Sequence, residues 1–264
     1  MMINSKVAVI IVNWKKYDIT SSCIESILNS TNSNFKIILV DNESDNKKVK
    51  NFKYRNEIKI IQNKKNEGFS KANNIGIDYA LKNNFDYTIL INNDTIVEKN
   101  LIEVLLKTAQ AKNFSVVQPL ILKYNGKEIW NAGGRINYFF GNFITRKKVG
   151  NSLNSSHELT EWLTGCCCLF KTKIFKEIGK LDESFFAYYE DVDFSLRLKK
   201  HGYKIGFTSK THLYHYESFS SISNNSKGGK LSPHIHYLNI RNHILILKKH
   251  SYLFNPFGTR LYQI

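Results

Sequence analysis

An acidic cluster flanked by aromatic residues could supply a catalytic base. Residues 188–193 read YYEDVD, which places the carboxylates of Glu190, Asp191 and Asp193 within four positions. On a helix, Glu190 and Asp193 would share one face and Asp191 would point elsewhere, because residues three apart are neighbours on a helix surface. A carboxylate in a cleft can take a proton from a hydroxyl nucleophile. The alternative is a helix N-terminus, where acidic residues interact favourably with the macrodipole.

Asp94 and one histidine could hold a divalent cation. Asp94 follows an expected strand, and a carboxylate there could bind Mg²⁺ or Mn²⁺, which would bridge phosphate oxygens. His212 and His215 would face opposite sides of a strand, so they form a poor pair, but one of them could share a metal with Asp94. We expect His234 and His236 to be surface residues, since no third or fourth ligand lies near them in the sequence.

Polar residues follow four expected strands at the point where each strand ends. They occupy positions 13–14, 41–44, 63–69 and 92–95. Each group alone could be a turn or a cap, because Asn and Asp are common there. Ligands of open α/β sheets bind beyond the carboxyl ends of the strands, so four such groups at one edge favour a ligand cleft. Neither GxGxxG nor GxxxxGK[ST] occurs, so a phosphate would not be bound as in dinucleotide-binding or P-loop proteins.

The segments that would position these residues alternate between strand and helix in the first half of the chain. A continuous apolar run, typical of a strand covered on both faces, occupies residues 7–12, and further strands are expected at 35–40, 58–61 and 87–91. Helices are expected from Asp18, as N-cap, to Leu28, from Ser70 to Ala80, and over 101–111. This alternation predicts an α/β fold with a mainly parallel, Rossmann-like sheet.

Shorter segments follow residue 115. We expect a strand at 162–170, helices at 173–178, 191–201 and 236–250, and a mobile loop at 218–230, which is rich in Ser, Asn and Gly. The last helix is amphipathic and basic at its end. These patterns divide the chain into a first half (1–115), a second half (116–232) and a C-terminal amphipathic helical segment (233–264).

The charge of the chain indicates an anionic partner or a solvated basic surface. The 264 residues include 38 Lys and Arg against 22 Asp and Glu, which gives a net charge of +16. Nucleic acid, anionic lipid and diphosphate-bearing substrates would all be attracted. No helix-turn-helix, ribonucleoprotein or zinc-finger signature accompanies the charge, so we expect no nucleic-acid partner.

The cysteines and the apolar runs indicate a cytoplasmic protein. Cys166–Cys168 are adjacent, Cys23 stands apart and no CxxC occurs, so we expect buried, reduced thiols rather than disulfides or a zinc ribbon. The first apolar run spans only six residues, which is too short for a signal peptide or a membrane-spanning helix.

An ordered set of motifs covers residues 6–222. The motifs are VIIVNW (9–14), ILVDNES (38–44), NEGFSKANNIGI (66–77), LINNDT (90–95), WLTGCCCLFK (162–171), FFAYYEDVDFSLRL (185–198) and HYESFS (215–220). In this order they resemble the inverting family 2 glycosyltransferases, and most closely the rhamnosyltransferase-like enzymes of bacterial cell-surface polysaccharide synthesis. The resemblance implies a GT-A fold whose first half binds a nucleotide-sugar donor and whose second half binds the acceptor.

The resemblance also implies roles for residues of the first half. Val12, Asn13 and Asp41 would line the nucleoside pocket, and its floor would be formed by Asn66, Phe69 and Asn73. The segment Asn92, Asn93, Asp94 occupies the place of the family's DxD motif, from which it departs at Asn92. Asp94 would be the principal ligand of a divalent metal cofactor, and His215 a second ligand or a phosphate contact.

For the second half, the resemblance implies that Asp191 is the catalytic base. Glu190 would support the base or the acceptor, and Trp162 would lie near the acceptor sugar. The implied donor is dTDP-rhamnose, with UDP-hexoses next, and the acceptor is a saccharide, in the favoured case lipid-linked. The C-terminal segment could then contact the anionic inner face of the cytoplasmic membrane. It could equally pack on the domain or on a second subunit.

The alternative to an enzyme is a non-catalytic GT-A module that binds a nucleotide sugar or a polysaccharide. Asn92 supports this alternative, since it removes one carboxylate from the expected metal site. The presence of Asp94, Asp191 and His215 argues against it.

Overall fold

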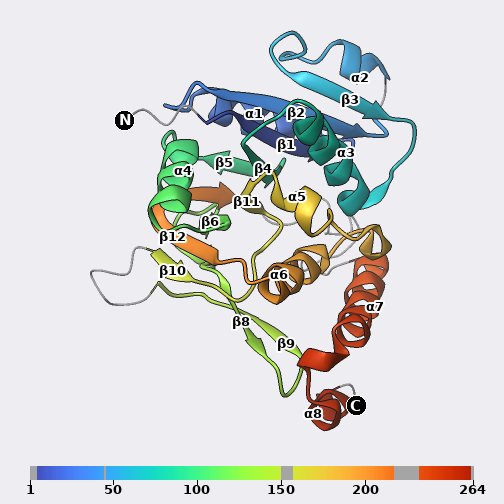
Figure 1. Ribbon diagram of the computed structural model, residues 1–264. Coiled ribbons are helices and arrows are strands. Elements are labelled where there is room, and N and C mark those ends of the chain that lie inside the picture. Colours follow the sequence, from blue (N-terminus) through green and yellow to red (C-terminus); the bar gives the residue numbers. More distant parts are fainter. Residues whose placement is uncertain (1–4, 45, 150–156, 217–231, 263–264) are drawn as a thin grey trace.

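The computed structural model describes residues 5–44, 46–149, 157–216 and 232–262, and these form one large mixed sheet with helices on both faces (Figure 1). The strand order is β10-β12-β6-β11-β4-β1-β2-β3, with β5 paired to β12 and β7 to β6. The strands of this sheet are β1 (Val7–Asn13), β2 (Phe35–Asn42), β3 (Lys59–Asn63), β4 (Tyr87–Asn92), β5 (Thr95–Val97), β6 (Val116–Lys123), β7 (Ile129–Asn131), β10 (His157–Leu159), β11 (Cys167–Lys171) and β12 (Ile205–His215).

The predicted α/β fold is confirmed. The first half of the chain forms four neighbouring parallel strands, and β6 and β12 of the second half form another parallel pair. Strands β3, β2, β1 and β4 are all parallel. Strand β11 pairs antiparallel with both β4 and β6, which makes the sheet mixed. Since β11 and β6 come from the second half, a single sheet continues across residue 115 and carries polar residues of both halves to one edge.

Alternate side chains of each strand pack against opposite layers of helices. Val9 and Ile11 of β1 pack with helices α1 (Tyr17–Leu28) and α4 (Leu101–Ala111). Ile10 of the same strand packs with α3 (Gly68–Lys82), α5 (Ile174–Glu177) and α6 (Glu190–Lys200). Both faces of the central strands are therefore covered, which explains their continuous apolar sequences. A short helix, α2 (Asn46–Lys50), lies between β2 and β3.

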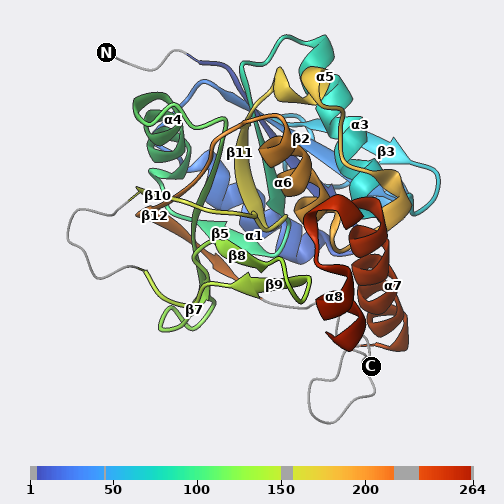
Figure 2. The same cartoon turned by 60° about the horizontal axis from the view of Figure 1, so that its bottom comes forward.

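A third core joins the C-terminal segment to the rest of the molecule. Helix α7 (Pro233–Lys249) begins after Ser232, whose hydroxyl caps it, and is followed by the 3-10 turn η2 (Ser251–Leu253) and helix α8 (Pro256–Tyr262). Ile246 and Leu247 of α7 pack with Leu196 of α6 and with the hairpin of β8 (Gly134–Asn137) and β9 (Asn142–Thr145). Figure 2 shows α7 and α8 beside this hairpin. No described helix is long and apolar enough to cross a membrane.

The described elements match most of the predicted ones, but several starts differ from the prediction, and α7 begins at Pro233 rather than His236. Helix α1 begins at Tyr17 with Lys16 as N-cap, so Asp18 lies in the first turn and is not the cap. Helix α3 begins at Gly68 rather than Ser70, because the N–H groups of Phe69 and Ser70 are held by the Phe186 carbonyl. Residues 162–166 are not part of a strand. The N–H groups of residues 163–166 bond to side chains, as that of Thr164 does to Gln118, and β11 starts at Cys167. The predicted loop at 218–230 lies outside the described residues.

The expected state of the cysteines is confirmed for all four. Cys23, Cys166, Cys167 and Cys168 are buried and free of disulfides. Burial raises the pKa of each thiol, to about 12 for Cys23. The thiols therefore stay protonated and unreactive at neutral pH.

Candidate functional site

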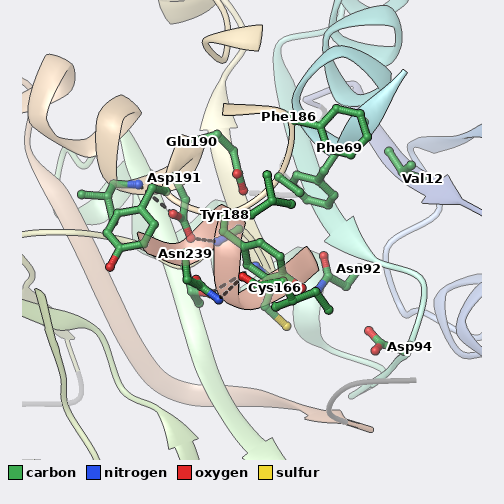
Figure 3. A pocket seen from close by; sticks show the side chains of 18 of the residues that line it. Val12, Phe69, Asn92, Asp94, Cys166, Phe186, Tyr188, Glu190, Asp191 and Asn239 are labelled. Atoms are coloured by element: carbon green, nitrogen blue, oxygen red, sulfur yellow. Dashed lines mark hydrogen bonds between the residues drawn. The ribbon is translucent and has the colours of Figure 1, made fainter. Parts of the chain in front are cut away.

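A cavity of about 710 Å³ opens at the carboxyl ends of β1, β2 and β4. Its wall is shared by both halves of the chain and by the first turns of α7. Figure 3 shows Asp191 and Glu190 on one side of this pocket and Asp94 on another. The sheet edge predicted to carry a ligand cleft is thus the site of the large pocket.

Most of the residues expected at the donor side do reach this pocket. Those that line it are Val12, Asn42, Asn66, Phe69, Asn92, Asn93 and Asp94. Asn13, Asp41 and Asn73 do not line it, since they are at most 1% exposed and lie behind its wall. Their expected contacts with a nucleoside remain a prediction.

Asn13 and Asp41 belong to a buried hydrogen-bond network under the pocket. The Asp41 carboxylate accepts bonds from the Asn13 amide (3.0 Å), the Tyr17 hydroxyl (2.8 Å) and the Ser44 N–H (3.1 Å). Burial, and then Asp41, raise the pKa of the Tyr17 hydroxyl above its ordinary value, so it remains a donor. The Asn13 carbonyl oxygen accepts from Thr20 (2.9 Å). This network fixes the ends of β1 and β2, which carry the pocket wall.

Asp94 and His215 form the candidate metal site. The Asp94 Oδ1 and His215 Nε2 atoms lie 3.2 Å apart, and both residues are buried at the pocket wall. The ring of Trp130 meets the His215 ring edge to face, with 4.6 Å between centroids. His212 does not line the pocket and instead pairs with Glu98, so the two histidines face different sides of β12, as predicted.

The donor atoms present fit a divalent cation that also takes oxygens from a ligand. Two ligand atoms of one octahedral ion, each about 2.1 Å from it, lie about 3 Å apart, which matches the Asp94–His215 spacing. The Asn92 Oδ1 and His215 Nδ1 atoms are buried without hydrogen-bond partners among the described residues. Within the same residues no cluster of three or more His, Cys, Asp or Glu could hold a metal unaided. The remaining ligands would have to come from phosphate or water.

Glu190 and Asp191 start α6, and both line the pocket. Asp191 Oδ2 accepts the Gly165 N–H (2.7 Å) and Oδ1 accepts the Val192 N–H (2.8 Å). Burial raises the pKa of Asp191, while these two N–H groups oppose the shift. Burial, and then the charge of Asp191, raise the pKa of Glu190 well above its usual range, and its Oε2 has no partner among the described residues. Asp191 is therefore the better anion of the pair, and Glu190 holds its proton to higher pH than Asp191 does.

Asp193 does not share a helix face with Glu190, contrary to the expectation from helical spacing. Its carboxylate is fully buried on the other side of α6, where it meets Arg197 (2.8 Å), Lys249 (2.7 Å) and His250 (2.9 Å). Because Glu190 is the first residue of α6 and follows a left-handed Tyr189, its side chain leaves the helix toward the pocket.

The segment before Glu190 has a strained backbone. Phe186, Tyr188 and Tyr189 all have positive φ angles of 61–71°, which cost residues other than glycine of order 1–3 kcal/mol each. The Phe186 carbonyl accepts the N–H groups of Phe69 (2.6 Å) and Ser70 (3.1 Å). Gly68 is required beside it, since a Cβ there would lie 2.5 Å from the Phe186 ring.

Several pocket residues were not anticipated from the sequence. The Gly165 N–H holds the Asp191 carboxylate, and a glycine inside an expected strand is a usable signal for such a close approach. Trp130 and Phe143 line the second half of the pocket with Trp162, whose indole donates to the Arg135 carbonyl (3.2 Å). Asn239 of α7 also lines it. Nothing in the local sequence near Trp130, Phe143 or Asn239 distinguishes them from core residues.

Comparisons with known proteins agree with the resemblance. The family described as "Glycosyltransferase like family 2" matches residues 4–227. A hexosyltransferase of low-salt glycan biosynthesis, Agl10 of Haloferax volcanii, is 27% identical over 202 residues, which are 75% of this chain and 63% of that protein. The rhamnosyltransferase WbbL of Escherichia coli is 23% identical over 234 residues, 84% of this chain and 87% of WbbL.

A shorter match and a solved structure complete the picture. The N-acetylglucosaminyl-diphospho-decaprenol L-rhamnosyltransferase of Mycobacterium tuberculosis is 33% identical over 69 residues, 26% of this chain and 22% of that protein. The crystal structure of GalNAc-T7 with UDP, GalNAc and Mn²⁺ superimposes with a TM-score of 0.69 at 17% identity, covering 81% of this chain and 44% of that one. At that identity the likeness establishes the fold alone, which is GT-A. This chain thus spans less than two thirds of both Agl10 and GalNAc-T7.

Proposed function

The chain belongs to glycosyltransferase family 2, and from this premise we propose that it moves a sugar from a nucleoside-diphosphate donor to a saccharide hydroxyl with inversion. The observation that carries the proposal is the single pocket that holds Asp191 together with Asp94 and His215. A base for the acceptor and a site for the leaving diphosphate are the two groups this transfer needs.

In the proposed reaction, Asp191 accepts the proton of the acceptor hydroxyl. The hydroxyl oxygen attacks the anomeric carbon from the face opposite the diphosphate, the bond to the diphosphate breaks and the configuration inverts. The N–H groups of Gly165 and Val192 orient the Asp191 carboxylate. Burial raises the pKa of Glu190, and in its protonated form Glu190 can donate a hydrogen bond to the acceptor.

Asp94 and His215 would hold a divalent cation, Mg²⁺ or Mn²⁺, next to the diphosphate. When bound, such a cation neutralises the charge that develops on the leaving group. Asn92 and Asn93 lie on the same wall and can contact phosphate oxygens through their amides.

For the donor, we propose dTDP-rhamnose first and a UDP-hexose second. WbbL and the mycobacterial relative are rhamnosyltransferases by name, and Agl10 is a hexosyltransferase. The nucleoside would lie between residues of the first half, against Val12, Asn66 and Phe69, above the layer of Asn13, Asp41 and Asn73.

For the acceptor, we propose a lipid-linked saccharide that binds to residues of the second half, with its sugar near Trp162 and Glu190. The name of the mycobacterial relative includes a diphospho-decaprenol acceptor, which supports this class. The pocket also reaches Asn239 and Leu238 of α7, so an acceptor can extend from the site along the C-terminal segment.

Substitution of Asp191 tests the proposed base. Asp191→Asn keeps the shape of the side chain but cannot accept a proton, so we expect transfer to fall at least about a thousandfold. Binding of the free nucleotide should stay within about twofold, because Asp191 does not lie on the donor wall. The transfer rate would be measured from the release of dTDP or UDP. Nucleotide binding would be measured by calorimetric titration with dTDP, UDP and GDP. Wild-type transfer rates in Asp191→Asn would refute the assignment.

The same titrations, run with and without Mn²⁺, test the metal site and the alternative function. We expect Asp94→Ala to abolish the Mn²⁺-dependent part of nucleotide binding. Equal affinity of the wild-type protein with and without Mn²⁺ would refute the metal site. A non-catalytic module would instead bind a nucleotide sugar tightly and release no nucleotide with any acceptor. The feature that favours this alternative is Asn92 at the first position of the DxD motif.

A further inference from the structure

A buried side chain of α7, Asn242, contacts the strained segment that precedes Glu190 and Asp191. Its amide nitrogen lies 3.0 Å from the carbonyl oxygen of Phe185, 2.8 Å from that of Ala187 and 2.7 Å from that of Tyr188. Two N–H groups are therefore shared among three acceptors. Asn242 has no exposed surface and is not part of the pocket wall.

The three carbonyls belong to a tight turn of the backbone. Phe186, with φ 61° and ψ −62°, is the centre of a γ-turn closed by the Ala187 N–H and the Phe185 carbonyl (2.7 Å). This left-handed form is rare and strained, so it persists only where its surroundings hold it. The Asn242 amide bonds to the carbonyls on both sides of Phe186.

Arg241 fixes the orientation of that amide. Its Nε donates to the Asn242 side-chain oxygen (2.8 Å), which leaves the amide nitrogen directed at the turn. The same guanidinium donates through Nη2 to the carbonyls of Ser184 (3.0 Å) and Phe185 (2.9 Å). His243, the next residue, stacks on Tyr189 with 5.6 Å between ring centroids.

The opposite side of the turn is held by α3, through the N–H groups of Phe69 and Ser70 on the Phe186 carbonyl. The turn is thus held between the donor-side helix α3 and the C-terminal helix α7. Four residues separate Phe186 from Asp191, and the intervening Tyr188 and Tyr189 are also left-handed. A relaxation of the turn would move the start of α6 and shift Asp191 away from Gly165.

We propose that Asn242, oriented by Arg241, is a positioning residue for the catalytic carboxylate. The proposal rests on the proposed function of Asp191 as the base. It assigns to the C-terminal segment a part in catalysis that does not involve contact with substrate: α7 keeps the turn strained, and the strained turn keeps Asp191 at the pocket.

The test compares two buried substitutions that each remove hydrogen bonds. Asn242→Leu keeps the side-chain volume and removes all the amide donors. Thr88→Val removes the buried bond between the Thr88 and Thr172 hydroxyls (2.9 Å) in the sheet, away from the pocket, and is the matched control. For Asn242→Leu we expect kcat to fall about 100-fold, because a misplacement of about 1 Å can cost that much. Donor KM and nucleotide affinity should stay within about twofold. Thr88→Val should keep its kcat.

A second variant decides the matter if Asn242→Leu does not fold. Arg241→Met removes the group that orients the amide, and we expect a fall in kcat of about tenfold with unchanged donor KM. Arg241→Lys should recover less than half of the loss, since an ammonium cannot contact the amide and both carbonyls in one plane. In both Asn242→Leu and Arg241→Met, hydrolysis of the donor by water should fall less than transfer, because water needs no precisely placed acceptor base.

Asp191→Asn, measured alongside, separates failure of this proposal from failure of the proposed function. If Asp191→Asn is inactive while Asn242→Leu and Arg241→Met keep the kcat of Thr88→Val, the base stands and the positioning role is overturned. If kcat and nucleotide binding fall together in proportion to the unfolded fraction, Asn242 is only structural and the proposal is again overturned. If Asp191→Asn transfers sugar normally, the proposed base itself is wrong.

Discussion

At the scale of single residues, Glu190 and Asp191 are adjacent in the chain but differ in their partners. Asp191 accepts two backbone N–H groups, whereas Glu190 Oε2 has no partner among the described residues. Two carboxyl groups this close cannot both ionise cheaply, and hydrogen bonds to the anion decide which one carries the charge. In the proposed reaction Asp191 would be the base, and Glu190, which holds its proton to higher pH, would be a hydrogen-bond donor to the acceptor.

This division predicts the pH dependence of transfer. Burial raises the pKa of Asp191. Because the proposed base accepts a proton only when it is ionised, kcat should decrease as the pH is lowered through this pKa, which lies above the ordinary aspartate value of about 4. Glu190→Gln imitates the protonated glutamic acid. Because Glu190 holds its proton to higher pH than Asp191, we expect this variant to keep kcat within about tenfold and to leave the acid limb unchanged. Measurement of kcat between pH 4.5 and 9 checks both statements, and an acid limb displaced in Glu190→Gln would mean that Glu190 is charged while Asp191 titrates and would contradict the pairing.

At the scale of elements, the sequence patterns predict β1 to β4 and part of β11, but neither β6 and β12 nor the left-handed turn. Continuous apolar runs such as that of β1 follow from burial on both faces, and helix α4 lies at the residues expected. The positive φ angles at Phe186, Tyr188 and Tyr189 have no local signal, because aromatic residues disfavour that conformation. These angles depend on hydrogen bonds from α3, which precedes the turn in the chain, and from α7, which follows it by more than fifty residues.

The partners of Asp193 also come from a distant segment, since Lys249 and His250 lie at the end of α7. These contacts predict a pH dependence of stability. Burial alone would raise the pKa of Asp193. The hydrogen bond from His250 and the charges of Arg197 and Lys249 oppose this effect and lower the pKa to about 2. A carboxyl group whose pKa is lowered by folding stabilises the folded state at pH values above its unfolded-state pKa of about 4. This contribution is lost as the pH falls toward 2. We expect Asp193→Asn to lower the free energy of unfolding by about 2 kcal/mol at pH 7.

Denaturant unfolding at several pH values measures this contribution. The difference between wild type and Asp193→Asn should shrink between pH 4 and pH 2. Asp78→Asn is the control, because its partner Lys180 forms a surface pair (2.6 Å) with the aspartate 57% exposed, which is worth less than about 1 kcal/mol. A difference between wild type and Asp193→Asn that stays constant down to pH 2 would mean that packing, and not charge, joins α6 to α7.

At the scale of the whole molecule, the site is assembled from segments that the chain brings together only on folding. Strand order places β11 between β4 and β6, so that Gly165 comes near Asp191 while Asp94 and His215 meet at the neighbouring β5–β12 pair. Local sequence signals could identify Asp94, His215 and Asp191 as candidates. Their convergence in one pocket depends on sheet order, which periodicity does not encode, and here the motif resemblance carried the prediction.

The surface around α7 and α8 has the composition of a lipid-binding face. Among the described residues, eight of the twelve exposed large hydrophobic side chains lie there: Phe139 and Phe140 at the tip of the β8–β9 hairpin, Tyr237, Ile240 and Ile244 on α7, Tyr252 in η2, and Phe257 and Leu261 on α8. The hairpin and α8 are in contact, since a Cβ at Gly258 would lie 2.2 Å from the Phe139 carbonyl. Residues 232–264 include Arg241, Lys248, Lys249 and Arg260 but no Asp or Glu. Apolar side chains among basic ones favour anionic bilayers.

Removal of the C-terminal segment would be a poor test of membrane binding, because α7 also holds the turn before Asp191. Point substitutions on its exposed side separate the two roles. We expect the triple variant Ile240→Ser, Phe257→Ser, Leu261→Ser to lower partitioning onto vesicles containing anionic phosphatidylglycerol at least about tenfold, while transfer to a water-soluble acceptor stays unchanged. Leu159→Ser, which alters an equally exposed leucine on β10, should sediment with vesicles like the wild type. Raising the salt concentration should weaken binding of the wild type, because the basic side chains act through screened charges. Equal sedimentation of the triple variant and the wild type would contradict membrane binding through this face.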